Sequence, residues 1–369
     1  MTALSYVSVR LRGEKAETSE ADRVFDAGAG MTAREFARAN AVPEDLLAAA
    51  LGVSGGELDK QLSSFPVEEG RFYADLYKRL ALRAEEGSKN WRKIALKFAL
   101  WFAFLAYVFV LMRRGPVSGR RRNLLYLSAV AVFGVLLGAD PSPMGTVKDA
   151  LVLFGAKRAI FPPRLLALSV FLLLVILANK FICAWGCQLG TLQDLLFRVN
   201  GGPDRQPGLL RQYKPAFVFT NTVRVLFFGV FAFIALDRGV DIIGPVDPFK
   251  LFKPAALTLA GWGFAGAILV LSLFVYRPWC QLCCPFGLAG WLAEKISVFK
   301  IKVNYETCVA CGACAAACPS TVMGAILKRE RAIPDCFACG ACVAVCPTRS
   351  VSFASGPRAL PPPGKFEKE

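Results

Sequence analysis

The sequence of 369 residues contains no histidine. Without an imidazole ligand, the chain cannot hold a histidine-ligated haem, a Rieske centre or a histidine-based copper site. It offers 13 cysteines instead, so thiolates have to carry any metal that the protein binds. We therefore expect no haem.

Charged residues are also scarce, at 20% of the chain against 55% hydrophobic residues, and the mean hydropathy is +0.45. This composition excludes an ordinary soluble globular domain. Apolar windows close to the length that crosses a hydrocarbon core about 30 Å thick occur at about 94–112, 123–139, 164–182, 216–236 and 255–276. We expect an all-α integral membrane bundle of about five transmembrane helices, in contact with membrane lipid.

The formal net charge of +16 is unevenly distributed along the chain. Basic residues gather in the loops at 113–123 and 180–215, whereas the loops at 140–163 and 237–254 are nearly balanced. By the positive-inside rule, the two basic loops and the C-terminal region from 277 are cytoplasmic. We therefore expect a multi-pass protein of a bacterial inner membrane.

Residues 1–90 are acidic on balance and are typical of a small helical soluble module. Thr32 can cap a helix together with Glu35, Pro43 suits the first turn of a second helix and Gly52 suits its end. The acidic character argues against nucleic-acid binding, so we expect a docking or packing module.

The side of the membrane on which this module lies depends on two opposing arguments. Five spans and a cytoplasmic C-terminus place it outside the cytoplasm. The basic residues Lys89, Arg92, Lys93 and Lys97 at the start of the first window favour the opposite. Because the arginine cluster at 113–122 is denser, we follow the number of spans and expect the module outside.

The most specific motif lies near the C-terminus. Residues 308–319 and 336–347 each have the spacing C-x2-C-x2-C-x3-C-P, which holds one [4Fe–4S] cluster with three nearby thiolates and sends the fourth cysteine to the other cluster. This predicts two clusters with crossed ligands. The first is ligated by Cys308, Cys311, Cys314 and Cys346, and the second by Cys336, Cys339, Cys342 and Cys318.

The remaining cysteines belong to an internal repeat. Aligning "CAWGCQLGTLQDLL" with "CQLCCPFGLAGWLA" matches Cys183 to Cys280, Cys187 to Cys284, Gly190 to Gly287 and Leu195 to Leu292. Cys283 has no counterpart and is expected to be a packing residue. The four paired cysteines, which we call the membrane cysteines, have three possible roles. They form a metal or redox centre, above all a third iron–sulfur centre; they carry out reversible thiol chemistry or copper handling; or they are inert packing residues.

We predict four parts in the chain. They are the helical module at 1–90, a transmembrane region at 91–299, a ferredoxin-like α+β dicluster domain at 300–352 and a flexible tail at 353–369.

The order of these motifs resembles the membrane polyferredoxins of the NapH and NosR type and, more distantly, the CcoG/RdxA type, over residues 120–350. The resemblance implies electron transfer between a membrane quinone pool and a partner redox protein. The chain departs from the family in two places. Its first membrane motif reads CAWGCQ instead of containing Cys-Pro, and residues 1–90 lack an S-G-A-T-type attachment motif, so covalent FMN is not expected.

Three further residues are candidates for binding a quinone or balancing charge. Arg224 lies within an apolar window, where a charge is costly and often functional, although it can also extend its charged end to the interface. Trp185 and Trp279 flank the membrane cysteines and either line a quinone pocket or form part of an aromatic belt.

These patterns together predict a membrane-bound iron–sulfur electron-transfer protein. No group of catalytic acid, base or nucleophile is visible, so we expect an electron-transfer subunit and not a complete enzyme. The alternative is a metal (copper) reductase or a cofactor-assembly factor that uses the membrane cysteines.

Overall fold

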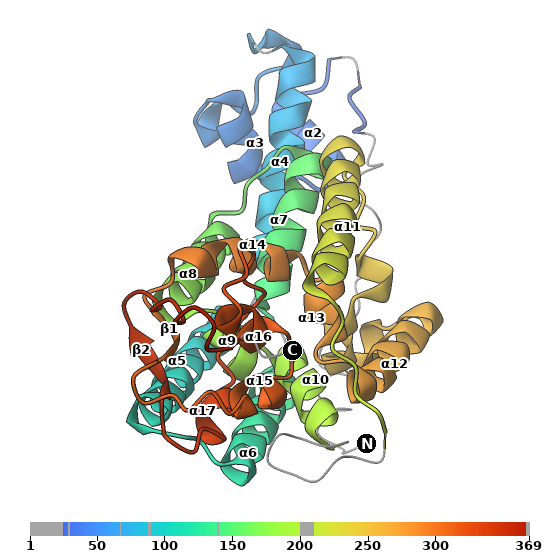
Figure 1. The fold of residues 1–369 in the computed structure, drawn as a ribbon. Helices are drawn as coiled ribbons and strands as arrows, with labels where there is room; N and C mark the ends of the chain where they lie inside the picture. Colours follow the sequence, from blue (N-terminus) through green and yellow to red (C-terminus); the bar gives the residue numbers. More distant parts are fainter. Residues whose placement is uncertain are drawn as a thin grey trace. The chain divides into compact units, whose positions relative to one another are not determined.

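The computed structural model describes residues 25–366, except for 29, 67, 88–89, 139 and 200–209. The chain divides into two compact units, residues 1–85 and 86–369, which we describe separately. The elements of each can be followed by their labels in Figure 1.

The first unit is a small helical module. It contains α2 (Ala33–Ala39), α3 (Glu44–Leu51), η2 (Gly55–Glu57), η3 (Leu62–Ser64) and α4 (Glu69–Gly87), which runs past the boundary of the unit. The predicted cap of α2 is confirmed, because Thr32 and Glu35 each bond the other's backbone N–H. Gly52 ends α3 with a φ of 71°, and Phe36 and Leu47 are fully buried in the core.

The second unit is built mainly of helices. In chain order they are α5 (Trp91–Arg114), α6 (Gly119–Ala129), the π-helix η4 (Val130–Leu136), α7 (Pro143–Lys157), α8 (Pro162–Ala178), α9 (Phe181–Trp185), α10 (Gln188–Val199), α11 (Phe217–Arg238), α12 (Leu259–Phe274), α13 (Pro278–Leu282) and α14 (Pro285–Ala293). The 3-10 turns are η5 (Gly244–Val246), η6 (Pro248–Phe252), η7 (Pro254–Ala256) and η8 (Glu294–Ile296).

Each of the five apolar windows falls on a helix, but the helices differ in length. By length and composition, α5 and α11, with 24 and 22 residues, are long and apolar enough to cross a membrane. The apolar helices α8 and α12 have only 17 and 16 residues, against about 20 for a typical span. The mostly helical fold is confirmed. The expected five transmembrane helices are not confirmed, since two helices within the described ranges are long and apolar enough to cross a membrane.

The segment 140–163 contains a helix where the sequence indicated only a loop. Ser142 caps α7, because its Oγ accepts a hydrogen bond from the Gly145 N–H at 3.0 Å, and a proline follows in the first turn. The helix packs closely on α11, beside which it lies in Figure 1. A Cβ atom on Gly155 would lie 1.7 Å from the carbonyl oxygen of Ala235, so this approach requires glycine.

The C-terminal part of the second unit is a small α+β domain. Strands β1 (Phe299–Val303) and β2 (Val351–Ser355) pair antiparallel, and α15 (Ala313–Ala317), α16 (Val322–Leu327) and α17 (Ala341–Ala344) lie between them in the chain. β2 extends into the predicted flexible tail at 353–369. Phe353 is buried there, and its ring centroid lies 5.6 Å from that of Phe109 of α5. Arg358 also contacts the domain, by donating to the Ile301 carbonyl at 3.0 Å.

Candidate iron–sulfur centres

The two C-terminal cysteine motifs have the same backbone conformation. Ala310 and Ala338 have φ angles of 53° and 48°, and Gly312 and Gly340 have φ angles of 73° each. Positive φ is uncommon outside glycine, and turns of this kind can direct backbone N–H groups into an anion-binding concavity. The matching conformations indicate that both loops are shaped for the same kind of group.

Four of the predicted ligands line a single cavity. It is narrow, and its wall includes Cys318, Cys336, Cys339 and Cys342. Three of these come from the second motif and Cys318 comes from the first, which is the crossed set predicted for the second cluster. The residues present therefore fit a [4Fe–4S] cluster.

The other four cysteines of the domain also gather. The pKa of the Cys314 thiol is raised to about 11, mainly by burial and also by the thiolate charges of Cys308, Cys346 and Cys311. Such contributions require the thiols to be near one another. Cys346 belongs to the second motif, so this set is crossed as well.

No three Cys, Asp or Glu side chains within the described ranges lie close enough together to hold a single metal ion. In a cubane cluster each thiolate binds a different iron, so its ligands stand farther apart than those around one ion. The spacing of the cysteines is compatible with clusters.

The membrane cysteines lie in a structural repeat in which a short helix is followed by a longer one. Cys183 lies in α9 and Cys187 just before α10, and Cys280 lies in α13 and Cys284 just before α14. A Cβ atom on Gly190 would lie 2.6 Å from the carbonyl oxygen of Cys183, and one on Gly287 would lie 2.6 Å from that of Cys280. In both copies glycine therefore lets the second helix pack against the first cysteine.

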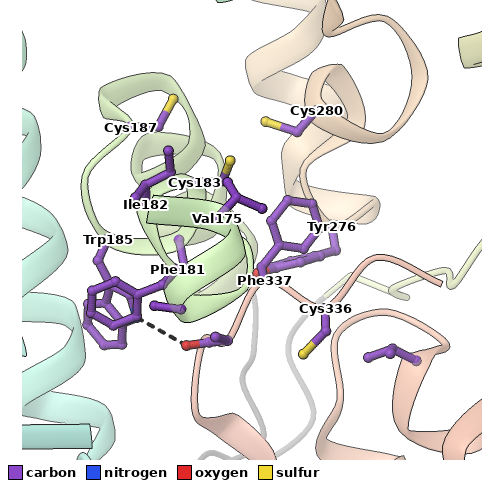
Figure 2. Packing of buried hydrophobic residues seen from close by; sticks show 14 of the residues in the cluster. Val175, Phe181, Ile182, Cys183, Trp185, Cys187, Tyr276, Cys280, Cys336 and Phe337 are labelled. Atoms are coloured by element: carbon purple, nitrogen blue, oxygen red, sulfur yellow. Dashed lines mark hydrogen bonds between the residues drawn. The ribbon is translucent and has the colours of Figure 1, made fainter. Parts of the chain in front are cut away.

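The two copies bring their four cysteines together. All four are between 7% and 8% exposed. Burial raises the pKa of the Cys284 thiol well above its ordinary value, and the charges of Cys280, Cys187 and Cys183 raise it further. In Figure 2, the thiol of Cys280 points toward the segment that carries Cys183 and Cys187. Cys283 differs from them, because burial alone raises the pKa of its thiol, to about 11.

Two fully buried cations stand beside these thiols. Arg277 donates from Nη1 to the Cys183 carbonyl at 2.5 Å and from Nη2 to the Ala184 carbonyl at 3.1 Å. Lys180 donates from Nζ to the Gly287 carbonyl at 2.6 Å. Burial raises the pKa of the Cys183 thiol, and both cations oppose that rise. Because a cluster with four thiolates is anionic, buried positive charge offsets the cost of placing it here.

Neither cation was among the residues predicted from the sequence, although the repeat contains a signal for both. Lys180 and Arg277 each stand three residues before the first cysteine of their copy. Each bonds a carbonyl of the opposite copy, Gly287 and Cys183 respectively. The two copies therefore hold each other through reciprocal charged hydrogen bonds.

A missed carboxylate, Asp194, stabilises Arg277. It accepts hydrogen bonds from Arg277 at 2.7 Å, from Arg198 at 2.6 Å, and from the hydroxyls of Tyr276 and Tyr126 at 2.8 Å and 3.1 Å. Although its burial favours the neutral form, the two arginines lower the pKa of Asp194 to about 2. Asp194 stays ionised beside the two arginines, as a buried carboxylate that accepts four hydrogen bonds can.

Asp335, also missed, connects the ferredoxin domain to the membrane motifs. This residue precedes Cys336 and forms ion pairs with Lys180 and with Arg224, whose Nη1 lies 2.9 Å from Oδ2 of Asp335. Arg224 also donates to the Gly287 carbonyl at 3.3 Å. Arg224 thus neutralises a carboxylate next to a predicted cluster ligand.

The two tryptophans that we associated with a quinone are fully buried. Trp185 donates from Nε1 to the Ala338 carbonyl at 3.1 Å, drawn as the dashed line in Figure 2. Trp279 packs edge-on against Phe227 and Phe264. Trp185 therefore links the first membrane motif directly to the loop of the second ferredoxin motif.

Two family models match the cysteine-containing segments. Residues 300–347 match a 4Fe-4S dicluster domain, and residues 160–206 and 257–304 both match a 4Fe-4S binding domain. The second model covers the two copies of the membrane repeat. No solved structure matches.

Curated proteins from three organisms are similar to parts of the chain. "Putative electron transport protein YccM" of Escherichia coli is 28% identical over 177 residues, which are 46% of this chain and 49% of that protein. An uncharacterized protein of Methanocaldococcus jannaschii is 26% identical over 173 residues, 45% of this chain and 63% of that protein. Protein NirI of Paracoccus denitrificans is 26% identical over 225 residues, 56% of this chain and 32% of that protein.

The chain thus spans between a third and two thirds of the length of these relatives. The matched segments contain the cysteine groups that the fold brings together. The predicted family resemblance is confirmed: the matched models and the similar proteins support an iron–sulfur polyferredoxin family of the NapH and NosR kind.

Proposed function

We propose that this protein is a multi-pass iron–sulfur electron carrier of a bacterial inner membrane, which passes electrons between the quinone pool and a partner redox protein. The observation that carries the proposal is the gathering of twelve cysteines into three groups of four within one compact unit. Each [4Fe–4S] cluster, when bound, accepts and releases one electron. Covalent FMN and haem are not part of the proposal.

Two clusters belong to the ferredoxin domain and the third to the membrane cysteines. The hydrogen bond from Trp185 to Ala338 and the ion pair between Lys180 and Asp335 support an order in which the membrane centre faces the second ferredoxin cluster. The side chain of Gln193 lies with Nε2 at 3.8 Å from Sγ of Cys280. A donor to a ligand sulfur of this kind adjusts the reduction potential of a cluster.

The ferredoxin domain is proposed to lie in the cytoplasm. The basic ends of both candidate spans contact it, since Arg113 donates to the Phe353 carbonyl at 3.1 Å and Lys214 to the Ala316 carbonyl at 2.9 Å. Positive charge at one end of each span agrees with the positive-inside rule. With five spans, the module at 1–90 lies on the other side.

The proposal is tested by electron exchange between the purified holoprotein and a short-tailed quinone. Protein reduced by dithionite and then freed of it is mixed with the quinone, and the visible absorbance of the clusters is followed in a stopped-flow instrument. We expect rapid reoxidation in the wild type and in Cys283→Ser, and its loss in Cys280→Ser. Fully loaded protein that never exchanges electrons, or that retains one Cu(I) on the membrane cysteines, would favour the copper alternative.

A further inference from the structure

A large cavity lies between α5, α7 and α8. Its volume is about 340 Å³, and its wall is mostly apolar. Trp91, Phe98 and Phe102 of α5 and Phe161 before α8 supply four aromatic side chains. An apolar cavity of this size is typical of a site for an organic molecule of moderate size.

Polar groups also line the same cavity. Asp149 and Arg164 both line it and form an ion pair at 3.5 Å between Oδ2 and Nη2. Ser142 and Thr146 of α7 also contribute to the wall. A few polar groups within an apolar wall orient a ligand that has one polar end.

A narrow second cavity, with room for about one water molecule, adjoins the first, because Phe98 and Pro141 line both. Its wall also includes Gly186 and Gln188, the two chain neighbours of Cys187. Gln188 is 2% exposed, and its Oε1 accepts no hydrogen bond from any residue that the structure describes. A buried acceptor without a donor is costly, so a donor in this narrow cavity, which one water molecule can supply, is favoured.

We propose that the large cavity binds a quinone or quinol, with its ring at the end formed by Phe98 and Pro141 and its apolar tail along α8. This inference rests on the proposed function and assigns a site to its quinone. The one water molecule for which the narrow cavity has room can donate both to Gln188 and to an oxygen of the ring, whereas a lipid acyl chain accepts no hydrogen bond from it. Leu166 of α8, 68% exposed at the rim, provides an apolar surface for the tail.

The proposed site places the ring beside the membrane cysteines. Trp101 of α5 lines the narrow cavity and donates from Nε1 to the Gly186 carbonyl at 2.9 Å, which holds the loop before Cys187. A Cβ atom on Gly186 would lie 2.6 Å from that same Nε1 atom, so the contact requires glycine. The cavity wall and a predicted cluster ligand therefore belong to the same loop.

The test uses the full-length holoprotein in phospholipid nanodiscs and a photoreactive azidoquinone with a decyl tail as the probe. Labelled peptides are identified by mass spectrometry, with excess unlabelled quinone as competitor. We expect competed labelling within 91–102 and 161–170. Ala167→Trp, which fills the cavity, should reduce labelling at least about tenfold, and Gln188→Leu should weaken binding about threefold to tenfold. The matched variant Ala267→Trp, on the exposed face of α12, should label like the wild type.

Iron content and melting temperature show whether Ala167→Trp folds, and Gln188→Leu serves as the test if it does not. If the wild type exchanges electrons with quinone but is labelled elsewhere, the site is wrong and the proposed function stands. If it neither exchanges electrons nor shows competed labelling, both fail. Retention of a phospholipid in the cavity that quinone does not displace would also overturn the site.

Discussion

At the scale of single residues, charge distinguishes the membrane cysteines from ordinary packing thiols. Lys180 and Arg277 are buried at equivalent repeat positions, and each bonds a backbone carbonyl of the opposite copy. Holding two cations away from water is costly unless negative charge compensates them. Asp335 and Asp194 supply part of that charge, and an anionic cluster at the membrane cysteines would supply more.

We predict that Arg277→Gln lowers the reduction potential of the membrane centre, because removing a nearby positive charge disfavours the added electron. The expected shift is on the order of 50–100 mV, from a loss of about 1–2 kcal/mol of interaction energy. An EPR-monitored redox titration measures it. Arg238→Gln, at the exposed end of α11, is the matched control. An unchanged potential in Arg277→Gln would mean that the arginine has only a structural role.

The cysteine groups could be predicted from the sequence because ligand spacing is local and the repeat aligns the rest. The ion pairs could not. Asp335 is 155 residues from Lys180 and 111 residues from Arg224, and nothing in the local pattern indicates such distant partners. The common offset of Lys180 and Arg277 from their cysteines was the available signal.

At the scale of elements, hydropathy locates helices better than it determines which of them span. All five windows fall on helices, but among the helices that the structure describes only α5 and α11 are long and apolar enough for full spans. The helix α7 was missed because its segment is balanced in charge and lies outside the apolar windows. The close packing of α7 on α11 depends on Gly155, and this contact exists only in the folded chain.

The proposed topology predicts the activity of alkaline phosphatase fusions in a bacterial host. Fusions after residues 158 and 245 should be active, because these positions lie outside the cytoplasm, and fusions after residues 205 and 350 should be inactive. Expression is checked by immunoblotting of each fusion. An active fusion after 350 would move the ferredoxin domain out of the cytoplasm and reject the topology.

At the scale of the whole molecule, the three cysteine groups form one continuous arrangement. The membrane repeat contacts the second ferredoxin loop through Trp185 and Lys180, and Cys318 and Cys346 each lie near the cysteines of the other ferredoxin motif. The narrow cavity that adjoins the proposed quinone site is lined by Gly186 and Gln188, the neighbours of Cys187. The arrangement suits transfer from a membrane carrier to a soluble partner.

The central claim, that twelve cysteines hold three clusters, is tested most directly by counting iron and acid-labile sulfide in the anaerobically purified full-length protein. The account predicts about twelve irons and about twelve sulfides per chain, since each cubane holds about four of each. Cys280→Ser should retain about eight of each, while Cys283→Ser stays at about twelve. A wild-type value near eight, unchanged in Cys280→Ser, would contradict the account and leave the membrane cysteines as packing residues.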